Sequence, residues 1–232
     1  MNFLTRKGLR CIAYDRRGHG RSSQPGQGYD YDTLADDLAA VISYLDLKQV
    51  TLISHSMGAG EIVRYLSRHG TNRIARILII SGTTPFILKT SDNPAGVDKK
   101  HFDELRAILS KDAPHFLVSG APRFLGKALE KISPEMIQWS TNLCFATSVK
   151  ALIDCTTAMS ETDFRDEMRK ITIPTLIIHG DEDQSAPLAS TGQRTAQLIS
   201  GSQLKIYECA PHGLFLTHME QLNNDILEFT LA

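Results

Sequence analysis

The sequence predicts an α/β fold in which helices cover both faces of a mostly parallel β-sheet. Short apolar runs of strand length alternate with segments of helical periodicity along most of the 232 residues. The alternation stops between residues 83 and 171, where no convincing strand is found. We therefore expect a core made of residues 1–82 and 172–232, with residues 83–171 as an inserted helical unit.

The strands are predicted from apolar runs that end in polar or small residues. Each run is four to six residues long, which suits a buried strand better than a helix that spans a membrane. The expected strands are residues 9–14, 50–54, 77–80, 175–178 and 204–207.

The helices are predicted from apolar residues that recur at helical spacing. One such face predicts a helix over residues 34–45, with Asp32 and Thr33 available to cap its start. A second helix follows the strand at residues 50–54 and stops at Gly70, and a last one covers about residues 217–229.

The insertion is predicted to be a helical cap. It follows a central strand, and an insertion there covers the sheet end where ligands bind in such folds. Most of its apolar residues are expected to form the core of the cap, while a few face the site. Its helical stretches are separated by Pro85, Pro94, Pro114, Pro122 and Pro134.

Composition excludes several classes of function. The chain is 42% hydrophobic and 22% charged, as in ordinary globular domains, and its net charge of −1 gives no electrostatic reason to expect nucleic acid or an anionic membrane as partner. The four cysteines show no C-x-x-C spacing, so we expect reduced thiols and a cytoplasmic location. The N-terminus lacks the continuous apolar stretch of a signal peptide.

Ser56 marks the main candidate for chemistry. It lies in Ser54-His55-Ser56-Met57-Gly58, between an apolar strand and a helix. The spacing is close to the G-x-S-x-G nucleophile elbow, in which small residues allow a sharp turn that exposes the serine hydroxyl. Ser54 replaces the first glycine, and a strand–turn–helix with a solvated serine is the alternative interpretation.

The partners that a serine nucleophile needs follow two later strands. Activation requires an imidazole held by a carboxylate, in the chain order nucleophile, acid, histidine. Asp181, Glu182 and Asp183 compete for the role of acid, and His212 is favoured over His218 as the base. Strand alternation predicts that His55 points away from the serine, and His179 is expected to be a satisfied histidine at a strand end.

The chain resembles the α/β-hydrolase superfamily, and within it the group of cofactor-free haloperoxidases (perhydrolases) and aryl esterases. The similarity covers almost the whole chain, from Gly8 to Leu231. It is carried by residues 14–22 (YDRRGHGRS), 29–38 (YDYDTLADDL), the elbow, 64–65, 68–70, 161–165 (ETDFR), 179–184 (HGDEDQ) and 210–213 (APHG).

The resemblance implies acyl transfer with Ser56 as nucleophile, Asp183 as the orienting acid and His212 as the base. The acyl-enzyme would release a carboxylic acid to water or a peracid to hydrogen peroxide, and the peracid would oxidise halide. It implies no cofactor and no metal, and no cluster in the sequence has metal-ligand spacing. The Met57 amide is the oxyanion donor that can be assigned.

The resemblance also implies an N-terminally truncated α/β-hydrolase fold. Relatives place a strand and an oxyanion loop before the run at residues 9–14, and this sequence has neither. The expected function is a serine esterase for small carboxylic esters, with perhydrolase activity. The alternatives are a catalytically impaired ligand-binding or remnant protein, and a true start upstream of Met1.

The expected partners are a small, uncharged ester or acid and hydrogen peroxide, without nucleic acid or membrane. An incomplete sheet also favours self-association into a homo-oligomer. The predicted substrate-binding residues line the sheet edge and the cap; they are Thr83, Phe86, Phe124, Trp139, Met159, Ser185 and Leu188.

Overall fold

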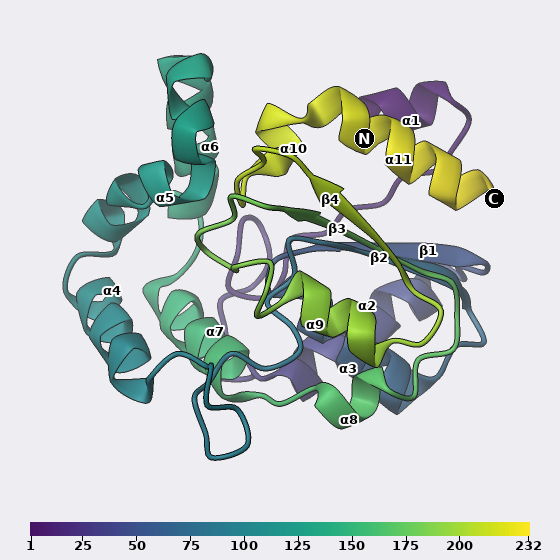
Figure 1. Ribbon diagram of the computed structural model, residues 1–232, viewed down its shortest axis with the longest axis horizontal. Coiled ribbons are helices and arrows are strands. Elements are labelled where there is room, and N and C mark those ends of the chain that lie inside the picture. Colours follow the sequence, from purple (N-terminus) through teal and green to yellow (C-terminus); the bar gives the residue numbers. More distant parts are fainter.

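The computed structural model describes residues 1–232 and contains one sheet of four parallel strands (Figure 1). The strands lie in the order β1-β2-β3-β4, so β1 and β4 form the two edges. Adjacent strands pair in parallel throughout, as the alternation of strands and helices predicts. Their bounds are β1 Val50–His55, β2 Ile74–Ile80, β3 Thr175–Gly180 and β4 Gln203–Tyr207.

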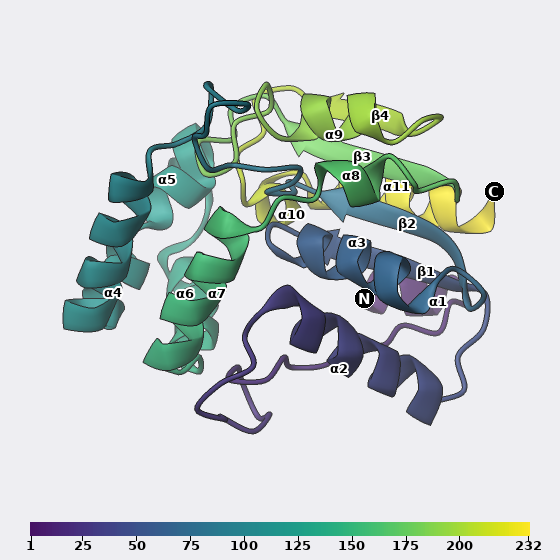
Figure 2. The same ribbon diagram turned by 90° about the horizontal axis from the view of Figure 1, so that it is seen from below.

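Helices cover both faces of this sheet (Figure 1 and Figure 2). The helices before the insertion are α1 Asn2–Arg6, α2 Tyr31–Tyr44 and α3 Gly58–His69. Within residues 83–171 lie α4 Lys99–Ser119, α5 Ala121–Leu125, the 3-10 helix η1 Gly126–Lys131, α6 Pro134–Phe145, α7 Val149–Glu161 and α8 Arg165–Met168. The C-terminal helices are α9 Gly192–Leu198, α10 Leu214–Thr217 and α11 Met219–Leu231.

The two faces of the sheet build two apolar cores, because successive side chains of a strand point to opposite faces. On one face, Ile77 and Ile79 of β2 pack with residues of α2, α3 and α8. On the other face, Leu78 and Ile80 pack with residues of α1, α10 and α11. Every residue of β3 is buried, as expected for a central strand that is covered on both sides.

The prediction of a strand over residues 9–14 is wrong. This segment belongs to no helix or strand, and β1 pairs only with β2. A strand is stabilised by hydrogen bonds to a neighbour, and none lies beside this segment. Tyr14 and Arg16 instead turn their side chains to the buried Glu61 of α3. Burial and the Glu61 carboxylate raise the pKa of the Tyr14 phenol well above its usual range.

The predicted cap of the first long helix is also displaced. Helix α2 begins at Tyr31, and the Asp30 carboxylate, 2.9 Å from the Thr33 amide nitrogen, caps its start. Asp32 instead forms ion pairs with Arg64 and with Arg68 of α3. The pattern of apolar residues located the helix, whereas the choice among three neighbouring polar residues depended on the backbone turn.

Helices α4 to α7 stand together at one side of the sheet in both views (Figure 1 and Figure 2). The segment 83–171 holds no strand, only the isolated bridges Leu88–Val97 and Thr90–Asn93. No helix anywhere in the chain combines the length and the apolar character needed to cross a bilayer.

Candidate active site

The Ser56 hydroxyl stands at a sharp turn between β1 and α3. Ser56 has a φ of +55°, a left-handed conformation that residues other than glycine rarely adopt. Its amide donates to the Ile80 carbonyl oxygen at 3.0 Å, which ties the turn to the end of β2. Gly58 opens the helix, and a Cβ there would lie 2.9 Å from the Arg16 guanidinium. The near-match to the elbow motif therefore corresponds to a strained turn.

His212 lies within hydrogen-bond distance of both Ser56 and Asp183. Its Nε2 is 3.0 Å from Ser56 Oγ, and its Nδ1 is 2.7 Å from Asp183 Oδ2. The carboxylate can only accept, so Nδ1 carries the proton and Nε2 is free to accept from the serine. Both His212 and Asp183 are buried. The turns after β1, β3 and β4 thus bring the three predicted catalytic residues together.

The loop around Asp183 keeps its carboxylate ionised. The amides of Ser185 and Ala186 donate to Oδ1 at 2.9 and 2.7 Å, and His179 Nε2 lies 3.4 Å from Oδ2. Burial acts to raise the pKa of Asp183, but hydrogen bonds from His179, His212 and Ala186 outweigh it and hold this pKa well below its usual range. The Asp183 carboxylate is therefore ionised when it accepts the hydrogen bond from His212 Nδ1.

The competing residues take no part in this arrangement. Asp181 is exposed, and the Glu182 carboxylate pairs with Lys127 at 2.6 Å. His218 lies at the start of α11, where its Nδ1 is 2.7 Å from the Thr217 hydroxyl. Asp181, Glu182 and His218 form no hydrogen bond or ion pair with Ser56 or His212.

The Met57 amide is free to donate a hydrogen bond to an anion. It follows Ser56 directly and makes no hydrogen bond within the chain. The Tyr31 hydroxyl donates to the Met57 carbonyl at 3.1 Å, which holds the peptide that follows Met57. An unpaired N–H beside a serine hydroxyl can stabilise a tetrahedral oxyanion formed there.

Three of the seven predicted substrate-binding residues contact the arrangement of Ser56, His212 and Asp183. Phe124 of α5 lies against the site, with its ring 5.4 Å from the His212 ring in an edge-on arrangement. Two others contribute backbone: the Thr83 amide donates to the Ser56 carbonyl at 3.3 Å, and the Ser185 amide to Asp183.

The other four are not brought to Ser56 by any polar or aromatic contact. Phe86 is buried beneath the Arg165 guanidinium, which lies 5.3 Å from its ring centre. Trp139 is 57% exposed on α6, and Met159 and Leu188 are half-buried. The apolar pattern of the insertion gave no information about which of its residues face the sheet.

Sequence reasoning missed the contact of His55 with His212, and the Phe215 ring that packs on His55. The His55 ring lies 4.7 Å from the His212 ring, and its Nε2 is 3.0 Å from the His212 carbonyl oxygen. Phe215 of α10 packs edge-on against His55 at 5.1 Å. No local pattern marks these contacts, since they join loops that are far apart in the sequence.

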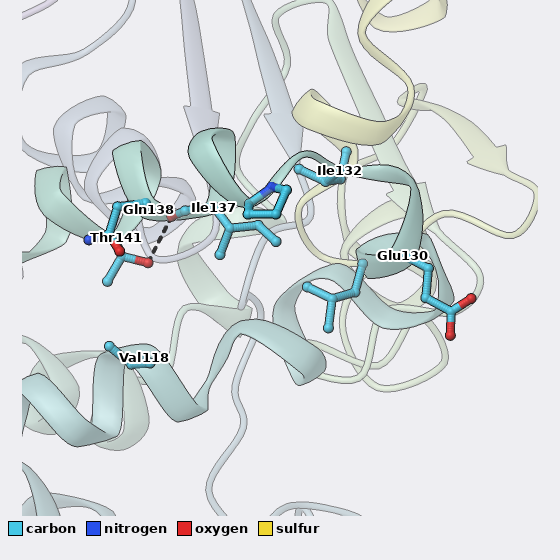
Figure 3. Close-up of a pocket in the computed structure, with 8 residues that line it drawn as sticks. Val118, Glu130, Ile132, Ile137, Gln138 and Thr141 are labelled. Carbon is cyan, nitrogen blue, oxygen red and sulfur yellow. Dashed lines mark hydrogen bonds between the residues drawn. The ribbon is translucent and has the colours of Figure 1, made fainter.

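An apolar cavity of 400 Å³ lies within the insertion, between α4, η1 and α6 (Figure 3). None of its lining residues contributes to the arrangement around Ser56. They are Val118, Leu129, Glu130, Ile132, Pro134, Ile137, Gln138 and Thr141. The structure holds no group of three or more His, Cys, Asp or Glu side chains suited to a metal ion.

The comparison with known families agrees with this geometry. The family described as the alpha/beta hydrolase fold matches residues 1–219. The chain belongs to this family. It is an enzyme of the α/β-hydrolase type, as the names of its relatives indicate.

Three relatives cover almost all of this α/β hydrolase. It is 38% identical to non-heme chloroperoxidase CPO-A1 of Kitasatospora aureofaciens, over 96% of this chain and 82% of that protein. It is 37% identical to the bifunctional esterase/perhydrolase DCH of Acinetobacter calcoaceticus, over 99% and 84%. A bromoperoxidase from Bacillus anthracis is 37% identical and superposes with a TM-score of 0.96, covering 100% of this chain and 85% of its own.

One expectation from the sequence concerns the N-terminal part of the fold. The family match begins at residue 1, and the relatives align along 82–85% of their own length. The expected N-terminal truncation of the fold is not borne out by them.

Proposed function

We propose that this α/β hydrolase is a serine esterase that cleaves small, uncharged carboxylic esters through an acyl-enzyme on Ser56, with hydrogen peroxide as a second acyl acceptor. The observation that carries the proposal is the continuous hydrogen-bonded path from Ser56 Oγ to His212 and on to the Asp183 carboxylate. Such a path activates a hydroxyl that is otherwise a weak nucleophile.

The first half-reaction forms the acyl-enzyme. Ser56 Oγ attacks the ester carbonyl carbon while His212 Nε2 takes the hydroxyl proton, and Asp183 stabilises the resulting imidazolium. The Met57 amide donates to the oxyanion of the tetrahedral intermediate. Collapse breaks the bond to the alkoxy group, which leaves as an alcohol with the proton from His212.

The second half-reaction releases the acyl group. Water or hydrogen peroxide attacks the acyl carbon, and His212 removes a proton from the attacking oxygen. The proton returns to Ser56 Oγ when the acyl bond to the enzyme breaks, and a carboxylic acid or a peracid leaves. The peracid then oxidises halide outside the acyl-transfer step. The names of the chloroperoxidase and esterase/perhydrolase relatives support the peroxide branch.

The alternative of an impaired binding protein has no support in these comparisons. The free Met57 amide and the hydrogen-bonded Ser56, His212 and Asp183 favour chemistry over ligand binding alone. Ligand binding alone does not require a base 3.0 Å from the hydroxyl of a strained serine.

Hydrolysis of a small aryl acetate tests the proposal. We expect turnover by the purified chain, and its loss to the background rate in Ser56→Ala and in His212→Ala. Adding hydrogen peroxide and bromide to the acetate reaction should brominate a phenolic dye only when Ser56 is present. A folded chain that is no faster than Ser56→Ala would refute the esterase proposal.

A further inference from the structure

His55 joins the turn that carries the nucleophile to the loop that carries the base. It is the last residue of β1 and precedes Ser56, and its Nε2 lies 3.0 Å from the main-chain carbonyl oxygen of His212. A carbonyl oxygen can only accept, so His55 Nε2 carries the proton and donates it. The hydrogen bond spans 157 positions of sequence.

This contact matters because the sheet does not by itself fix the distance between Ser56 and His212. β1 and β4 are the opposite edges, separated by β2 and β3, and no ladder joins them. Ser56 follows β1, and His212 follows β4. Small changes in twist across the sheet therefore act directly on the separation of nucleophile and base, unless a contact between the two loops resists them.

The surroundings of His55 hold its ring in one orientation and keep it neutral. Phe215 and Phe124 pack edge-on at 5.1 and 6.1 Å, and the His212 ring lies at 4.7 Å. Burial, with a smaller contribution from His212, lowers the pKa of His55 to about 4. A neutral ring with its proton committed to a carbonyl does not compete with His212 for the serine proton.

We propose that His55 is a positioning residue, which holds the main chain of His212 so that its imidazole stays within hydrogen-bond reach of Ser56. The inference rests on the proposed function for its kinetic consequence, but the contact itself can be tested without activity. A misplacement near 1 Å of a catalytic group costs on the order of 10²-fold in rate.

Two substitutions separate the hydrogen bond from the packing. His55→Phe keeps an aromatic ring against Phe215 and removes the donor, whereas His55→Gln keeps an N–H near the Nε2 position. We expect His55→Phe to lower kcat for a small aryl acetate by roughly 10- to 100-fold with KM within about twofold. His55→Gln should recover most of the loss. Equal rates for His55→Phe and the wild type, or equal losses in both variants, would overturn the inference.

A crystal structure of His55→Phe provides the test that does not depend on the reaction. We expect the distance between His212 Nε2 and Ser56 Oγ to exceed hydrogen-bond range, from 3.0 Å in the wild type. An unchanged distance overturns the inference, even in a slow variant. If His55→Phe does not fold, His55→Leu replaces it in both experiments. A wild type without esterase activity but with a displaced His212 in the variant would refute the proposed function and leave the positioning role standing.

Discussion

The central sheet and the helical insertion differ in how firmly their side chains are held. Every residue of β3 is buried, whereas helix α6 has no buried residue at all. Trp139 and Leu143 of α6 are 57% and 58% exposed, and Val118 of α4 is 53% exposed. The residues with chemical roles in our proposal come from turns at the ends of sheet strands. The sheet defines the reaction geometry, and the insertion contributes mainly Phe124 to the same region.

The sharpest test of this contrast is the acid that follows β3. Asp183→Asn should lower kcat for a small aryl acetate by ~10⁴-fold, because the amide cannot hold His212 in the tautomer that accepts from Ser56. Steady-state kinetics measures the loss. Asp181→Asn, in the same loop but exposed, is the matched control and should stay near the wild-type rate. Similar losses in both variants would show that charge near the loop matters more than the contact with His212.

Stability should show the same contrast when a leucine is shortened in each region. Leu176→Ala in β3 is expected to lower the free energy of unfolding by about 2–5 kcal/mol, since it removes a fully buried side chain and leaves a cavity. Leu143→Ala in α6 should change it by less than about 0.5 kcal/mol. Urea denaturation of both variants gives the comparison. A larger cost for Leu143 would mean that α6 packs more tightly than its exposure indicates.

The free energy of unfolding should fall at acidic pH because burial favours the neutral form of His55, at the end of β1. Its pKa is about 4 in the folded chain, below the ordinary value of 6.5, so between these values the unfolded chain binds a proton that the folded chain does not. One such proton makes the free energy of unfolding fall by up to about 1.4 kcal/mol per pH unit as the pH decreases. The titratable groups that act on His55 are His212, Asp183 and His179.

Removing this proton site should flatten the acid side of the stability curve. His55→Gln is expected to lose less stability between pH 6.5 and pH 4 than the wild type, by denaturation at a series of pH values. His101→Gln, at an exposed histidine of α4, serves as the control and should keep the wild-type slope. Parallel curves for His55→Gln and the wild type would contradict the lowered pKa.

The smallest effect is expected where the insertion meets the site. Phe124→Ala should lower kcat/KM for an aryl ester by roughly tenfold, because its ring packs against His212 and His55. Trp139→Ala should stay within about twofold of the wild type, since its side chain is mostly exposed. The reverse order would show that α6 closes over the substrate during turnover.

Local patterns predicted the central strands, the elbow and the order of the three candidate residues. These depend on apolar runs and on small residues at a turn, which are visible within a few positions. The residues alone did not separate Asp181 from Asp183, because that choice depends on which carboxylate the amides of Ser185 and Ala186 reach. The run at residues 9–14 has strand composition, but a strand also needs a neighbour, and local composition does not supply one.

Long-range contacts were the part that the sequence could not provide. The prediction for His55 concerned only its direction relative to Ser56, and its contact with the His212 backbone carbonyl is one that no side-chain pattern identifies. Trp139 was expected near the substrate because of its size and apolar character, and the structure leaves it on the surface. Both outcomes depend on how separate loops and helices pack.

The left-handed backbone at Ser56 has a consequence for the selection of thermostable variants of this enzyme. A strained non-glycine residue costs on the order of 1–3 kcal/mol, and glycine adopts such a conformation without that penalty. Ser56→Gly is thus expected to give a more stable protein, which is inactive under our proposed mechanism. A screen that rewards survival on heating, without an assay of turnover, would enrich clones that have lost the serine on which our proposed mechanism depends.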